Sequence, residues 1–142
     1  MSAAKLVPFL LATGGLAALH LIQKTMPASA NAGTTIAAAY LVATLTCLLA
    51  YPLLSPGQSP AEALRSVPWN AVAMGVAIAA CEIGVLLAYR AGWPVGTTGV
   101  AIGAVMTLVL FPVGVLAFGE ALTLTRAAGV ATTLAGLYLL AR

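Results

Sequence analysis

Residues 94–118 read PVGTTGVAIGAVMTLVLFPVGVLAF and contain no charged residue. Such a run is long enough to cross the hydrocarbon core of a bilayer, which takes about 20 apolar residues. Hydrophobic residues make up 62% of the 142-residue chain and charged residues 6%, whereas a soluble domain carries about 25% charged residues. The run lacks period-2 alternation, which favours a helix over a barrel strand. The chain is therefore expected to be an all-α polytopic membrane protein.

Further apolar stretches flank this one, separated by short segments in which Pro, Gly and Ser mark turns. We expect a single transmembrane domain over residues 1–142. Its five predicted transmembrane helices cover residues 6–24, 34–54, 69–90, 94–118 and 123–142. The longest polar link, residues 55–68, has room for one short helix at the membrane surface over residues 61–66.

The six Lys and Arg residues divide evenly between the two sides of the membrane that an odd number of crossings defines. On the side of the N-terminus lie Lys5, Arg65 and Arg126. On the opposite side lie Lys24, Arg90 and Arg142. An excess of Lys and Arg on one side normally fixes the orientation of a membrane protein. The even division predicts insertion in both orientations, although so few charges also divide evenly by chance. Two opposed copies would form an inverted pair, as found within many transporters.

Glu82 is the one acidic residue inside a predicted span, slightly past the middle of residues 69–90. A charge at that depth costs about 3 kcal/mol on insertion scales, and ionisable residues inside membranes are functional candidates by default. A buried carboxyl can exchange a proton for a cation, which is the chemistry of a proton-coupled antiporter. The alternative is a structural acid that hydrogen-bonds to a neighbouring helix or pairs with Arg90 near the same helix face.

His20 and Tyr89 are secondary candidates for the polar lining of a substrate site. His20 lies in the last third of residues 6–24. It could bind a substrate or relay a proton with Glu82, and the alternative is a histidine that orients the first helical hairpin. Tyr89 lies near a helix end, where aromatic residues often mark the membrane interface. Gln23 is expected near the membrane surface and is interpreted as a residue that caps a helix end or contacts lipid headgroups.

Small residues four positions apart allow helices to approach closely in lipid. Gly99 and Gly103 have this spacing in residues 94–118, and Thr132 and Gly136 have it in residues 123–142. We expect these positions to pack against another helix or against a second copy. Pro112 interrupts the backbone hydrogen bonds of its helix and predicts a kink. The kink could serve as a hinge for alternating access or could be a fixed bend.

The sequence does not indicate an enzyme, a cofactor or a metal site. It contains no nucleophile triad, no phosphate-binding loop and no cluster of metal ligands. Cys47 and Cys81 both fall inside predicted spans and are interpreted as small apolar residues buried in the bundle. The net charge of +3 is spread singly along the chain, so no nucleic-acid partner is expected.

The last quarter of the chain carries the pattern Gly119-Glu120-x-Leu122, followed by Gly129 and Gly136. In pattern and spacing it resembles the end of EamA-type domains of the drug/metabolite transporter superfamily. Small multidrug resistance transporters have a similar ending, usually with Gln at the position of Glu120. The chain length and the predicted helix count are also similar to those of one EamA half.

Full EamA-type transporters contain two five-helix halves in inverted orientation, so the resemblance implies that this chain works as a homodimer. Residues 123–142, with Gly129, would pack against their counterpart, and a central cavity would be lined by the first, third and fourth predicted helices. Two features depart from the family pattern. Small multidrug resistance transporters carry their essential glutamate on the first helix, whereas Glu82 is on the third. EamA domains often have a proline near the position of Thr107, earlier than Pro112.

These features predict a small-molecule transporter of the cytoplasmic (inner) membrane that works by alternating access as an antiparallel homodimer. It would export a cationic or zwitterionic metabolite or drug, by proton exchange if Glu82 titrates. One alternative is a non-coupled facilitator or lipid-carrier flippase of the same fold. Another is a non-transporting subunit of a heteromeric membrane complex.

Overall fold

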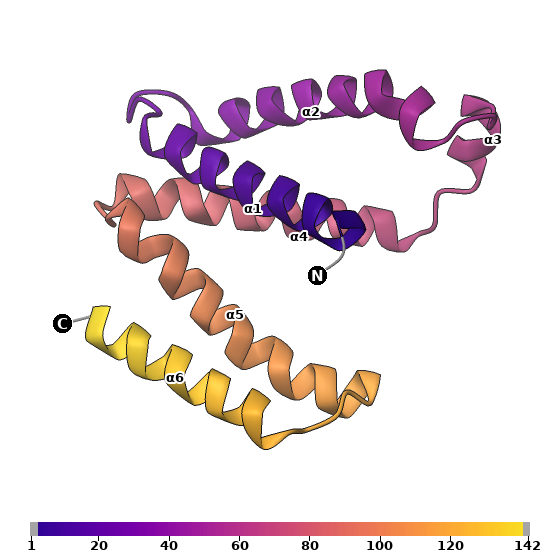
Figure 1. Ribbon diagram of the computed structural model, residues 1–142. Helices are drawn as coiled ribbons and strands as arrows, with labels where there is room; N and C mark the ends of the chain where they lie inside the picture. Colours follow the sequence, from indigo (N-terminus) through magenta and orange to yellow (C-terminus); the bar gives the residue numbers. More distant parts are fainter. Residues whose placement is uncertain (1–2, 141–142) are drawn as a thin grey trace. The chain divides into compact units, whose positions relative to one another are not determined.

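The computed structural model describes residues 3–140, and helices joined by short links make up this part of the chain, without a strand. The helices, in order, are α1 (Ala3–Lys24), α2 (Ala32–Leu54), α3 (Pro60–Arg65), α4 (Asn70–Arg90), α5 (Val95–Phe118) and α6 (Leu124–Leu140) (Figure 1). The all-helical fold class is confirmed, and the helix ends agree with the predicted ranges within three residues.

Side-chain caps explain several of these helix ends. The side chain of Asn31 accepts a hydrogen bond from the backbone N–H of Thr34 at 3.1 Å, so α2 begins at residue 32, two residues before the predicted start. Ser59 caps α3 in the same way through the N–H of Glu62 at 3.2 Å. The short helix predicted in the polar link is thereby confirmed. At α6, the hydroxyl of Thr123 accepts from the N–H of Arg126 at 3.2 Å.

Large apolar side chains cover much of the described surface. Leu53, Leu116 and Leu124 are 86%, 85% and 88% exposed. Apolar patches on such a scale are not tolerated on soluble monomers. The helices α1, α2, α4 and α5 are each long and apolar enough to cross a membrane. These properties are those of a multi-pass membrane protein.

The structure describes most of the fifth predicted span as α6. α6 contains 17 residues, which gives a length of about 26 Å at the usual rise of about 1.5 Å per residue. The hydrocarbon core is about 30 Å thick. Residues 141 and 142 lie outside the described residues, and the fifth crossing stays a prediction.

The described chain forms two compact units. One covers residues 22–91 and contains the end of α1 together with α2, α3 and α4. In this unit α2 and α4 run antiparallel and are connected through α3 (Figure 1). Ile36 of α2 and Val85, Leu86 and Tyr89 of α4 are buried, so the buried apolar residues gather where α2 begins and α4 ends.

The other unit comprises the described parts of residues 1–21 and 92–142, in which α5 and α6 form an antiparallel hairpin (Figure 1). Gly119 ends α5 at φ 65°, a left-handed conformation that glycine adopts without steric cost. The N–H of Glu120 then donates to the carbonyl oxygen of Gly114 at 3.0 Å. The Glu120 carboxyl lies so close to Gly114 that an added Cβ would be 3.2 Å from its Cδ. Arg126 pairs with the same carboxyl at 3.4 Å, so the Gly119-Glu120 sequence has a structural role in this turn.

Candidate substrate site

Glu82 lies in α4, about 12 Å before the end of the helix at the usual helical rise. The side-chain amide of Gln23, near the end of α1, donates a hydrogen bond from Nε2 to Oε2 of Glu82. Gln23 is only 6% exposed. A polar partner of this kind reduces the free-energy cost of placing an acid inside the membrane.

Gln23 lies near the end of α1 but is buried and hydrogen-bonded to Glu82, which the sequence did not indicate. α4 continues for about two turns beyond Glu82, and the link between α1 and α2 folds over this extension. There Arg90 donates from Nη2 to the carbonyl oxygen of Ala30 at 2.6 Å. Gln23 is therefore buried by other residues although it lies next to the end of α1. Arg90 anchors this link, a role that the sequence did not indicate.

Tyr40 of α2 adds a third polar side chain beside Glu82. Its hydroxyl is buried without a hydrogen-bond partner among residues 3–140, and it is close enough to the Glu82 carboxyl to interact with it electrostatically. Leaving a buried polar group unpaired costs about 1–3 kcal/mol, so a bound ligand that pairs with this hydroxyl would be stabilised. We call Glu82, Gln23 and Tyr40 the polar cluster.

Tyr40 was not among the candidates predicted from the sequence, although its position within a predicted span is unusual for a tyrosine. Tyr40 is well inside the predicted span of residues 34–54, whereas membrane tyrosines usually lie at the interfaces. A tyrosine displaced from the interface brings a hydroxyl into an apolar region, where it needs a partner.

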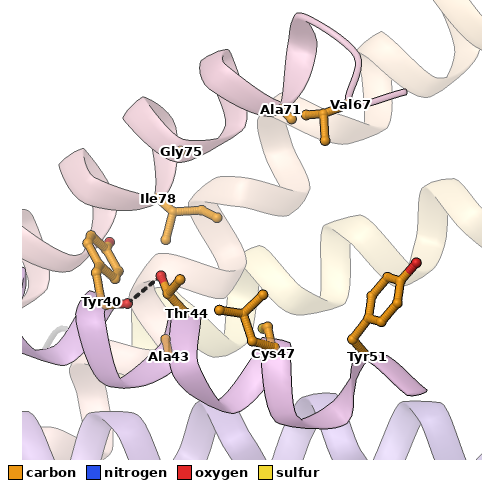
Figure 2. A pocket seen from close by; sticks show the side chains of 10 residues that line it. Tyr40, Ala43, Thr44, Cys47, Tyr51, Val67, Ala71, Gly75 and Ile78 are labelled. Atoms are coloured by element: carbon orange, nitrogen blue, oxygen red, sulfur yellow. Dashed lines mark hydrogen bonds between the residues drawn. The ribbon is translucent and has the colours of Figure 1, made fainter. Parts of the chain in front are cut away.

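A groove of about 690 Å³ is lined mainly by residues of α2 and α4, and Tyr40 is the member of the polar cluster that lines it. Figure 2 shows Tyr40 at one end of the groove and Tyr51 and Val67 toward the other. The hydroxyl of Thr44 is bonded to the backbone oxygen of Tyr40 at 2.8 Å, so this side chain presents mainly its methyl group. Apolar or small residues make up most of the remaining lining, among them Ala43, Cys47, Leu48, Ala71, Gly75 and Ile78. Both size and composition are typical of small-molecule sites, which measure about 300–1,000 Å³.

Tyr89 lies on the same helix as Glu82 but contacts a different group of residues. It is 6% exposed, and the Lys24 ammonium lies 5.4 Å from its ring centroid, within the range of a cation–π interaction. Tyr89 lines a smaller cavity together with Lys24 and Arg90. Its role as substrate lining stays a prediction.

His20 belongs to the part of α1 that falls in the other unit, and its side chain is half-buried. A proton relay between His20 and Glu82 therefore stays a prediction. α5 is a continuous helix on both sides of Pro112, and the hinge at this residue likewise stays a prediction.

The glycines predicted to pack against another helix have open space around them. A Cβ atom added at Gly99, Gly103, Gly129 or Gly136 would meet nothing within 4 Å. Thr132 bonds through its hydroxyl to the carbonyl oxygen of Ala128 at 2.9 Å. The contact of these positions with a second copy stays a prediction.

Within the part of the chain that the structure describes, no group of three or more His, Cys, Asp or Glu residues is placed to hold a metal ion. Comparison of the chain with protein-family models, curated proteins and solved structures gives no match. Fold and site together define a class: a multi-pass helical membrane protein with an acid inside one of its apolar helices and an apolar groove between two of them.

Proposed function

We propose that the chain is a small-molecule transporter of the drug/metabolite type whose substrates combine a cationic or zwitterionic group with an apolar body. The observation that carries this proposal is the hydrogen bond between Gln23 and Glu82 together with the electrostatic interaction of Glu82 with Tyr40, whose side chain lines one end of the groove. A carboxyl inside a membrane is expensive and marks substrate or proton pathways. A large apolar pocket with a few convergent polar groups is the usual form of a small-molecule site.

The polar cluster suits an exchange of protons for cations. The ionised Glu82 carboxylate attracts a cationic group, while Tyr40 supplies a hydroxyl and the groove receives the apolar body. When the carboxyl is protonated it no longer attracts the cation. Substrate and proton therefore compete for one group, so each substrate bound releases a proton. Alternating access of this site to the two sides of the membrane would convert the competition into export.

We further propose that two copies assemble in opposite orientation in the inner membrane, with α6 as a fifth crossing in each. Lys24 ends α1 and Arg90 ends α4, whereas Arg65 ends α3 and Arg126 lies in the first turn of α6. If each apolar helix crosses the membrane, these cations would divide evenly between its two sides. Small residues on α5 and α6 with open space around them provide room for close contact with a second copy.

Uptake of a lipophilic cation into proteoliposomes containing the purified full-length chain tests the transport function. We expect uptake that depends on a pH gradient across the membrane. Uptake without a gradient would favour a non-coupled facilitator. Transfer of labelled lipid in place of the cation would favour a flippase. A chain that transports nothing and co-purifies with a different chain would overturn the proposal in favour of a subunit role.

Terminal tags on intact cells test the antiparallel pair. Because the orientation bias is close to nil, each tag is expected to be reached from outside in one part of the population and protected in the other. Gln58→Lys adds a charge to the link between α2 and α3 and is expected to shift the population toward the orientation with this link in the cytoplasm. Gln58→Ser is the matched control. A wild-type chain with one uniform orientation would contradict the pair.

A further inference from the structure

A second cavity lies in the unit of residues 22–91, where α1 and α4 end. It measures about 160 Å³ and is lined by Gln23, Lys24, Met26, Ala28, Tyr89 and Arg90. Sites for drug-sized molecules measure about 300–1,000 Å³, so this cavity suits a ligand smaller than a drug-sized molecule. Its lining includes two cationic residues and no acidic residue.

Two polar atoms of this lining are buried without a hydrogen-bond partner among the described residues: Nε of Arg90, a donor, and Oε1 of Gln23, an acceptor. Both side chains are nevertheless held in place by their other ends. Arg90 is anchored through Nη2 to Ala30, and Gln23 is anchored through Nε2 to Glu82. Buried polar groups in native proteins almost always have partners. A fixed donor and a fixed acceptor without partners therefore point to a ligand.

The charges of the cavity define the ligand further. Arg90 and Lys24 bring a guanidinium and an ammonium group to it from the ends of two helices, and such groups bind phosphate oxygens through charge-assisted hydrogen bonds. The unpaired acceptor on Gln23 requires a donor in the same ligand. A primary ammonium group next to a phosphate meets both needs. The ends of apolar helices are also the level at which phospholipid headgroups lie.

We propose that this cavity binds the phosphoethanolamine group of a membrane lipid, with the phosphate at Arg90 and Lys24 and the ammonium donating to Oε1 of Gln23. A soluble phosphoethanolamine offers the same chemistry. The position of the cavity at the ends of α1 and α4 favours the lipid as its source. This site is independent of the proposed transport, since it rests on other atoms and another cavity. Gln23 nevertheless connects the two sites, because its side chain hydrogen-bonds to Glu82 and is also part of the cavity lining.

Native mass spectrometry of the purified chain in mixed micelles tests the site, with phosphatidylethanolamine and phosphatidylcholine compared at equal acyl chains. The choline headgroup has the phosphate but no N–H donor. We expect the wild-type chain to retain phosphatidylethanolamine roughly tenfold more tightly, the effect of a hydrogen bond to a charged group. Gln23→Leu should remove this preference and leave the affinity for phosphatidylcholine unchanged. Arg90→Gln and Lys24→Gln should each weaken the binding of both lipids.

Arg65→Gln is the matched control, because Arg65 ends α3 and does not line the cavity. It should bind both lipids as the wild type does. Equal retention of the two lipids by the wild-type chain would overturn the proposal. So would a loss in Arg65→Gln as large as in Arg90→Gln, because binding would then depend on net charge alone. Displacement of the lipid by soluble O-phosphoethanolamine would support the site with a soluble occupant, and resistance to displacement would support the lipid.

Discussion

Glu82→Gln is expected to reduce proton-coupled uptake of a cationic substrate into proteoliposomes at least about tenfold, which corresponds to a loss of about 1.4 kcal/mol. Glutamine has nearly the same shape as the neutral acid and can still hydrogen-bond to Gln23. It can neither carry a negative charge nor release a proton. The substitution therefore removes the exchange chemistry and leaves the packing of α4 in place. Initial rates are to be measured with and without a pH gradient.

Glu62→Gln is the matched control for this substitution. Glu62 is an exposed acid in α3, outside the membrane-spanning helices, and its replacement changes the net charge of the chain by the same amount. It should leave uptake unchanged. If Glu82→Gln transports like the wild type, the proposed role of Glu82 is wrong. The structural alternative for Glu82 predicts this result, because a neutral glutamine would replace a hydrogen-bonded acid at little cost.

Thermal unfolding in detergent separates the two roles further. If Glu82→Gln unfolds at the wild-type temperature but has lost uptake, the carboxyl serves transport. If stability and uptake fall together, the carboxyl stabilises the fold through an interaction that glutamine does not replace, and the loss of uptake follows from the loss of the fold. Glu82→Asp adds a third point, because it keeps the acid but shortens its reach toward Gln23. We expect it to retain part of the uptake.

The features that the sequence predicted are local ones. Hydropathy alone locates the apolar helices, because a backbone in lipid must pair within its own segment. Short-range caps such as Asn31 and Ser59 then account for where the helices begin. Glu82 stands out by the same logic, since one acid in an apolar run is conspicuous without any knowledge of its neighbours.

The features that the sequence did not reveal depend on contacts between distant residues. Gln23 and Glu82 are 59 positions apart, and Arg90 and Ala30 are 60 positions apart. Neither pair follows from a helical period. The burial of Gln23 accompanies the packing of the link between α1 and α2 against the end of α4, which composition alone does not predict. The spacing of the glycines also did not identify close contacts within the chain. In the α5–α6 hairpin, the glycine with a close contact is Gly114, which lies against the Glu120 carboxyl.

Gly75→Leu is expected to lower the uptake of cations with a large apolar body at least roughly fivefold, the effect of losing about 40 Å² of apolar contact at about 25 cal/mol per Å². Gly75 lines the groove, and a Cβ atom added there meets nothing within 4 Å. The leucine side chain can therefore enter the groove without straining α4. A small cation such as tetramethylammonium needs little of the groove, so its uptake should fall much less. Rates for the two cations in the same proteoliposomes provide the measurement.

Gly84→Leu is the control for Gly75→Leu, because Gly84 is on the same helix, is equally open and is not among the groove-lining residues. It should leave the ratio of the two rates at the wild-type value. A general loss of folding or insertion would lower both rates together, whereas blockage of the groove changes their ratio. An unchanged ratio in Gly75→Leu would show that the apolar body of the substrate binds elsewhere. Glu82 would then act on the cationic group alone, and the assignment of the groove would have to be abandoned.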